Sequence, residues 1–152
     1  ESNGAHTPLQ YRLSPDEIVA IEMAHPKRVD EWHDFFDRQL GKSADPQTLY
    51  QCGAGINSFH IDPYGRLCLC VLAREPQYDL RSGTFRDGWQ RALRIVRYQP
   101  FTDAYPCREC ELFTICEQCP GWAKMEHGNP VQPVRFLCEV AHRRAKAFDL
   151  KV

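Results

Sequence analysis

The chain of 152 residues is long enough for one domain, or for one domain with an appended helical segment. Its 19 lysine and arginine residues nearly balance 20 aspartate and glutamate residues, and the net charge of −1 gives no general attraction to nucleic acid or to an anionic membrane. No apolar run of about 18 residues occurs, so no transmembrane helix is predicted.

Two helices are predicted within residues 1–51. Ser14, Pro15 and Glu17 match a capping box with proline in the first turn, which indicates a helix to about residue 24. After Pro26, apolar residues recur at helical spacing as far as Leu40, and Gly41 is a typical stop. Residues 43–51 are predicted to be a linker, so the range 1–51 is expected to form a helical linker segment.

A β-hairpin is predicted next, over residues 57–72. The sequence Asp62–Gly65 suits a type I turn, and the runs on either side alternate between polar and apolar residues. Alternation along the second run would direct Cys68 and Cys70 to one face of the strand. Residues two apart on a strand are separated by about 7 Å, so both thiols could approach one centre.

Three more helices are predicted toward the end of the chain, with a cysteine-rich loop between the first and the second. They span residues 84–98, 120–126 and 134–150. The first carries a stripe of Arg91, Arg94 and Arg97, predicted as a solvated face, with a contact to phosphate or to an acidic peptide as the alternative. The expected fold class is α+β: a small β-hairpin core, surrounding helices and cysteine-rich metal-binding loops, with residues 52–152 as the principal domain.

Cysteine carries the strongest functional signal. The eight cysteines are Cys52, Cys68, Cys70, Cys107, Cys110, Cys116, Cys119 and Cys138. Between Cys107 and Cys119, two CxxC pairs are separated by five residues, a spacing that lets the chain wrap around an ion or a cluster. The alternative is the disulfide framework of a secreted domain. The polar start of the sequence and the length of the chain favour metal binding in a reducing cytoplasm instead.

Ligand count alone does not separate two all-thiolate zinc sites from two 4Fe-4S clusters. Zinc ribbons favour CxxC pairs a dozen or more residues apart, whereas only five residues lie between Cys110 and Cys116. Small and apolar neighbours such as Gly53, Ile115 and Pro120 suit a bulky, partly dry cluster.

The whole pattern resembles a known family. Cys52, twelve residues, Gly65, four residues and Cys70 are followed by the dense group and a lone Cys138. This order is similar to the SPASM domain of radical S-adenosylmethionine (SAM) enzymes, the C-terminal extension that carries auxiliary 4Fe-4S clusters in peptide-maturing members. The similarity covers roughly residues 52–145.

The resemblance implies two clusters with crossed ligation. One cluster would be bound by the first three cysteines of the dense group and by the last cysteine of the chain: Cys107, Cys110, Cys116 and Cys138. The other would be bound by Cys52, Cys70 and Cys119. Its fourth ligand comes, in some members, from a further cysteine near the position of Cys52, but residues 1–51 contain none. Either that iron is open or Cys68 binds it.

Two features depart from the family pattern. The pair Cys116 and Cys119 forms a CxxC, where a CxxxC is usual. Val71 stands where sulfatase-maturing members have an aspartate thought to act as a base, which argues against that reaction.

The resemblance implies an auxiliary role rather than catalysis by this chain alone. No CxxxCxxC motif and no strand–helix series long enough for a barrel occur, so S-adenosylmethionine is expected only in a barrel supplied by the same or a separate chain. The expected function is electron transfer and substrate positioning for peptide or protein modification. The alternative is a zinc-binding, four-cysteine interaction domain. Hydrolysis has little support, because neither a nucleophile elbow nor an HExxH motif accompanies His60 and Asp62.

Overall fold

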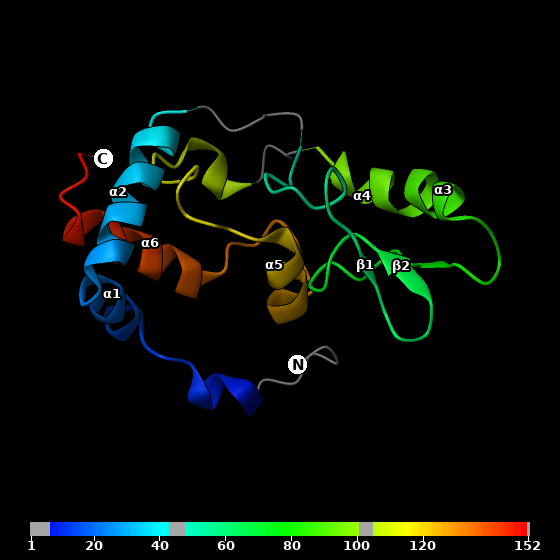
Figure 1. Cartoon of the computed structure of the whole chain (residues 1–152), viewed down its shortest axis with the longest axis horizontal. Coiled ribbons are helices and arrows are strands. Elements are labelled where there is room, and N and C mark those ends of the chain that lie inside the picture. Colours follow the sequence, from blue (N-terminus) through cyan, green and yellow to red (C-terminus); the bar gives the residue numbers. More distant parts are fainter. Residues whose placement is uncertain (1–6, 43–47, 101–104, 152) are drawn as a thin grey trace. The chain divides into compact units, whose positions relative to one another are not determined.

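The computed structural model describes residues 7–42, 48–100 and 105–151 (Figure 1). The chain has the predicted α+β fold, with helices and a small antiparallel sheet. It divides into two compact units, each built from separate segments of the sequence. The helical unit comprises Glu1–Ala44, Pro106–Gln118 and Pro133–Val152, and the sheet unit comprises Asp45–Tyr105 and Cys119–Gln132. The division predicted at residue 51 stays a prediction, and residues 43–47 of the predicted linker lie outside the described residues.

The helices of the helical unit begin where their caps predict. A short 3-10 helix, η1 (Thr7–Tyr11), precedes α1 (Pro15–Met23) and α2 (Pro26–Gln39). The capping box before α1 is complete, because Glu17 N donates to Ser14 Oγ at 3.3 Å and Ser14 N donates to the Glu17 carboxylate at 2.8 Å. After η3 (Pro106–Glu109), the unit ends with α6 (Arg135–Ala147), which agrees with the predicted C-terminal helix.

Aromatic side chains of α2 form the core of the helical unit. Phe36 is 2 % exposed, and its ring lies 5.4 Å from Trp32 and 5.1 Å from Phe148. Leu112, Ile115 and Cys116 of the cysteine-rich segment pack into the same cluster, together with alanines of α6. The apolar stripe of α2 therefore packs against the segment that carries the dense group of cysteines.

One arginine joins the helices of this unit through charge. Arg144 on α6 is 8 % exposed and donates two hydrogen bonds of 2.8 Å to the carboxylate of Glu22 on α1. A third donor of the same guanidinium lies 3.2 Å from the Glu117 carboxylate, and its carbon lies 4.1 Å above the Trp32 ring. Arg144 thus links α1, α2 and α6 to the cysteine-rich segment.

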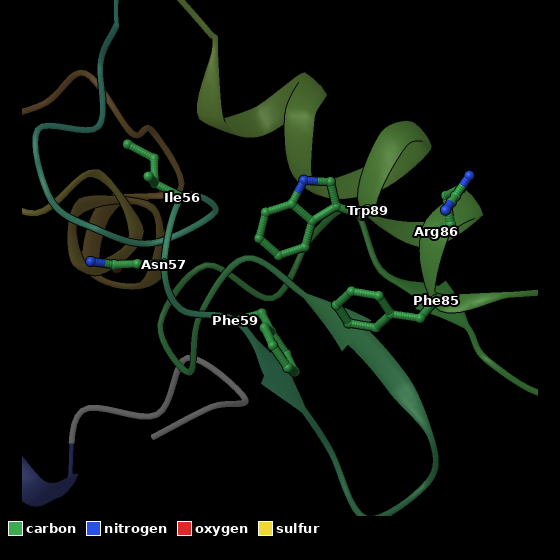
Figure 2. A pocket seen from close by; sticks show the side chains of 6 residues that line it. All are labelled: Ile56, Asn57, Phe59, Phe85, Arg86 and Trp89. Atoms are coloured by element: carbon green, nitrogen blue, oxygen red, sulfur yellow. The ribbon is translucent and has the colours of Figure 1, made fainter.

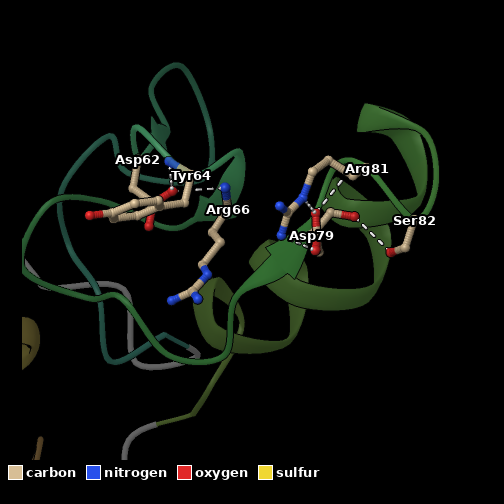
Figure 3. A network of polar contacts seen from close by, with 6 residues as sticks. All are labelled: Asp62, Tyr64, Arg66, Asp79, Arg81 and Ser82. Atoms are coloured by element: carbon tan, nitrogen blue, oxygen red, sulfur yellow. Dashed lines mark hydrogen bonds and ion pairs between the residues drawn. The ribbon is translucent and has the colours of Figure 1, made fainter.

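The sheet unit contains the predicted hairpin with shorter strands than expected. Strand β1 (His60–Ile61) pairs with β2 (Arg66–Cys68), and β2 also pairs with β3 (Tyr78–Asp79), which lies outside the predicted hairpin. Figure 3 shows the polar contacts of this sheet. Asp62 Oδ1 accepts hydrogen bonds of 2.9 Å from the backbone nitrogens of Tyr64 and Arg66, so this carboxylate stabilises the turn. Gly65 has a φ of 78°, which favours glycine.

Strand β2 is shorter than predicted, so Cys68 and Cys70 do not lie on one strand. Leu67, Cys68 and Leu69 are all buried, with exposures of 0, 3 and 1 %. Adjacent residues of a strand point to opposite faces, and both Leu67 and Cys68 are buried. Both faces of this central strand are therefore covered. The strand ends at Cys68, and Cys70 lies in the turn that follows it.

The helix predicted over residues 84–98 is present but contains a wider turn. It comprises α3 (Phe85–Gly88), the π-helical turn η2 (Trp89–Leu93) and α4 (Arg94–Arg97). Arg97 does not belong to a solvated stripe, because it is buried and donates to the Tyr50 carbonyl. The last helix of the unit, α5 (Pro120–His127), ends at Gly128 as predicted.

None of the helices within the described ranges is long and apolar enough to cross a membrane.

Candidate metal centres

The eight cysteines divide equally between the two units, and all are in the thiol form. The helical unit contains Cys107, Cys110, Cys116 and Cys138. The sheet unit contains Cys52, Cys68, Cys70 and Cys119. The chain passes from one unit to the other between Gln118 and Cys119, so the last thiol of the dense group lies with the cysteines of the hairpin region.

Tight turns fold the cysteine-rich segment of the helical unit. The backbone nitrogen of Cys110 donates to the Cys107 carbonyl at 3.2 Å, and that of Cys116 donates to the Phe113 carbonyl at 3.4 Å. Cys116 is 6 % exposed. Burial, and after it the nearby thiols of Cys138, Cys107 and Cys110, raise the pKa of its thiol to about 12. The four sulfur atoms therefore form one neighbourhood.

Gln118 holds the thiol that closes this group. Its Nε2 donates to Cys138 Sγ at 3.1 Å and to the Val134 carbonyl at 3.0 Å, while its Oε1 accepts from the Val134 nitrogen at 3.1 Å. Val134 is the N-cap residue of α6. One amide side chain therefore hydrogen-bonds to both backbone groups of the residue before α6 and donates to a cysteine sulfur. The only sequence signal for Gln118 was its place inside a CxxC gap.

The residue before Gln118 turns the chain. Glu117 has a φ of 44°, the left-handed region that non-glycine residues rarely adopt. Its carboxylate accepts a hydrogen bond from Arg144 at 3.2 Å. Arg144 thus helps to hold the backbone between Cys116 and Gln118 in the conformation that directs their side chains toward the thiol group.

Close backbone packing joins two thiol segments of the sheet unit. Gly121, in the first turn of α5, lies against the turn at residues 70–73, since a Cβ at this position would lie 3.0 Å from both Ala73 N and Leu72 C. The two segments each provide a backbone donor to sulfur. Ala73 N donates to Cys70 Sγ at 3.2 Å, and Trp122 N donates to Cys119 Sγ at 3.4 Å. Glycine at position 121 therefore permits the approach of Cys119 to Cys70.

Tyr50 lies near three of the thiols in the sheet unit. Burial raises the pKa of its phenol well above the ordinary value, and the nearby thiols of Cys119, Cys70 and Cys52 add to this. Tyr50 is 4 % exposed, and its carbonyl accepts from Thr48 Oγ1 at 3.2 Å as well as from Arg97. The three thiols for which the resemblance implied a shared cluster thus all act electrostatically on one buried tyrosine.

Cys68 has a different environment. Its thiol lies inside the hairpin, 3.8 Å from the His60 carbonyl and 3.6 Å from the Cys70 carbonyl. Either carbonyl can accept a hydrogen bond from it. Burial raises the pKa of the Cys68 thiol, with Cys70 as the next cause. A neutral thiol with two acceptors suits a small buried side chain.

Cysteine thiols can bind a cationic metal centre once they are deprotonated. Buried, neighbouring thiols disfavour the thiolate form, and a bound metal centre reverses this preference. Across residues 7–42, 48–100 and 105–151, no three or more His, Cys, Asp or Glu side chains are arranged to hold a metal ion. No family model, curated protein or solved structure matches this chain. The case for a function therefore rests on the thiol groups themselves.

Proposed function

We propose that this chain is an auxiliary iron–sulfur module of a radical SAM maturase, with one 4Fe-4S cluster in each unit. Cys107, Cys110, Cys116 and Cys138 would bind the cluster of the helical unit. Cys52, Cys70 and Cys119 would bind the cluster of the sheet unit. The observation that carries the proposal is the separation of the thiols into these two neighbourhoods, with the change of unit inside the dense group.

The surroundings of the sulfur atoms support iron–sulfur binding. Backbone or amide N–H groups donate to Cys70, Cys119 and Cys138. Such hydrogen bonds, together with burial, tune the reduction potential of a cluster. A tetrahedral zinc site with Zn–S bonds of about 2.3 Å brings its sulfur atoms to about 3.8 Å from one another, whereas a four-iron cluster accepts more widely spaced thiolates from distant segments.

Bound clusters would supply one-electron transfer, and the contribution of the protein is to hold and shield them. The chain lacks CxxxCxxC, so a barrel in the same or a separate polypeptide would have to generate the radical. In this arrangement the module passes electrons to or from the barrel and positions a peptide or protein substrate beside it.

Metal analysis of group-specific variants tests the proposal. After anaerobic reconstitution, the wild-type chain should contain about eight irons and eight sulfides, as two four-iron clusters require. Cys138→Ala and Cys119→Ala should each lose about half of the iron, and the double variant nearly all of it. Stoichiometric zinc with neither iron nor sulfide would contradict the proposal and favour the zinc-binding interaction domain. Complete loss of iron in Cys138→Ala alone would contradict two separate groups.

A further inference from the structure

Two exposed aromatic rings, Phe59 and Phe85, gather with the half-buried ring of Trp89 on the sheet unit (Figure 2). Phe59 lies 5.0 Å from Phe85 and 6.2 Å from Trp89, measured between ring centroids, and Phe85 lies 5.7 Å from Trp89. Phe59 and Phe85 are 48 and 42 % exposed, and the neighbouring Ile56 is 57 % exposed. Solvated aromatic clusters are uncommon on a domain surface and mark interaction sites.

These rings line a groove that admits a bulky side chain. The groove has a volume of about 440 Å³ and is bordered by Ile56, Asn57, Phe59, Phe85, Arg86 and Trp89. Trp89 begins the π-helical turn η2, and such turns are frequent at functional sites. In Figure 2 the rings of Phe59 and Phe85 lie below Trp89 and meet edge to face, and the Arg86 side chain projects outward from the same helix as Phe85. The floor is therefore apolar and one edge is cationic.

The charged side chains around the groove indicate which charge a bound ligand should carry. Within the described residues, Arg86 has no carboxylate partner in an ion pair, and Arg91 and Arg94 farther along the same helix are also exposed. The one carboxylate of this helix, Asp87, accepts hydrogen bonds from Thr84 Oγ1 at 2.6 Å and from Thr84 N at 3.3 Å. It is therefore committed to the helix cap, and the positive charge of Arg86 is available to a ligand.

We propose that this groove binds an acidic peptide segment by inserting one aromatic or large aliphatic side chain between the rings, with a carboxylate of the peptide paired to Arg86. The inference rests on the proposed function only in naming the class of its substrate or partner peptide. It requires no cluster, because none of the six lining residues is a cysteine.

Calorimetric titration of the full chain with short synthetic peptides tests the groove. The probe is acetyl-Asp-Glu-Phe-Glu-Asp-amide, and two matched peptides replace phenylalanine by serine or all four acids by lysine. Burial of a phenylalanine ring predicts about tenfold or greater preference for the probe over the serine peptide. The lysine peptide should bind more weakly, and added salt should reduce that difference. Equal binding of the three peptides would overturn the proposal.

Variants locate the binding and identify other occupants. Phe85→Ser and Arg86→Glu should each weaken probe binding about fivefold or more, whereas the control Ile95→Ser on the same helix should not, and Arg91→Glu should weaken it less than Arg86→Glu. Circular dichroism verifies folding, and Phe59→Ser replaces Phe85→Ser if the latter does not fold. Loss of binding in Ile95→Ser as well, or an equal loss in Arg91→Glu, would overturn the location. A chain that dimerises in sedimentation experiments, and becomes monomeric in Phe85→Ser, would show a second copy as the occupant and contradict the proposal.

Iron and sulfide are measured on each sample. Probe binding by an iron-free chain would contradict the cluster proposal alone. An iron-loaded chain that does not bind the probe would contradict the groove proposal alone.

Discussion

Replacement of Arg144 should destabilise the helical unit more than any change at an exposed ion pair. Arg144→Met keeps the aliphatic stem above Trp32 but leaves the Glu22 carboxylate without its partner. Breaking a buried pair costs about 3–5 kcal/mol. The Glu22 side chain retains 15 % exposure, so we expect a loss of about 3 kcal/mol, at the lower end of that range. With a urea m value of about 1.5 kcal/mol/M, the midpoint of unfolding falls by about 2 M.

A neighbouring arginine on α6 provides the matched control. Arg143 pairs with Asp16 at 3.0 Å, but these side chains are 45 and 73 % exposed, so Arg143→Met should cost about 0–1 kcal/mol. Urea unfolding is followed by circular dichroism and tryptophan fluorescence under anaerobic conditions. Adding Glu22→Gln to Arg144→Met should recover about 1–2 kcal/mol, because the charge then left without a partner is only that of Glu117, whose side chain is 60 % exposed. Equal midpoints for Arg144→Met and Arg143→Met would refute the reasoning, and an absent rescue would assign the loss to packing on Trp32.

Three further substitutions test the thiol neighbourhoods. Gln118→Leu should lower the reduction potential of one reconstituted cluster, because a hydrogen bond to Cys138 sulfur is lost; an unchanged potential in an EPR-monitored redox titration would contradict this. Gly121→Ala places a methyl group 3.0 Å from the backbone at residues 72 and 73, and this should destabilise the fold by about 1–3 kcal/mol and halve the iron content. Full iron content in this variant would argue against the role of that close approach. Cys68→Ala should retain all of its iron while Cys70→Ala loses half, and equal losses would identify Cys68 as a ligand.

Features encoded by neighbouring residues were predictable from the sequence. The caps at Ser14 and Thr84 each involve a partner three residues away, so both helix starts could be identified correctly. The turn at Asp62–Gly65 is equally local. The order of the cysteines also predicted two separate sets of cysteines, which a single CxxC motif does not indicate. The experiments above test whether these sets bind metal.

Features that depend on distant partners were not predictable. Strand β3 has two residues and no periodicity, and it exists because Tyr78 and Asp79 pair with Leu67 and Arg66. The burial of Cys68 follows from cover on both faces of β2, which alternation within one strand does not reveal. Arg144 and Glu22 are 122 positions apart, so their ion pair has no local signature.

The division into two units changes the interpretation of the CxxC formed by Cys116 and Cys119. A CxxC is ordinarily interpreted as two ligands of one centre, because the short gap lets both sulfur atoms face the same ion. Here the two cysteines belong to different units, and the intervening Glu117 and Gln118 hold the backbone through Arg144 and Val134. The gap of two residues therefore joins the two units, and in the proposed arrangement it links two thiol groups instead of forming one chelating loop. The missing residue relative to a CxxxC does not prevent Cys119 from lying beside Cys70, because Gly121 permits the close packing that brings their segments together.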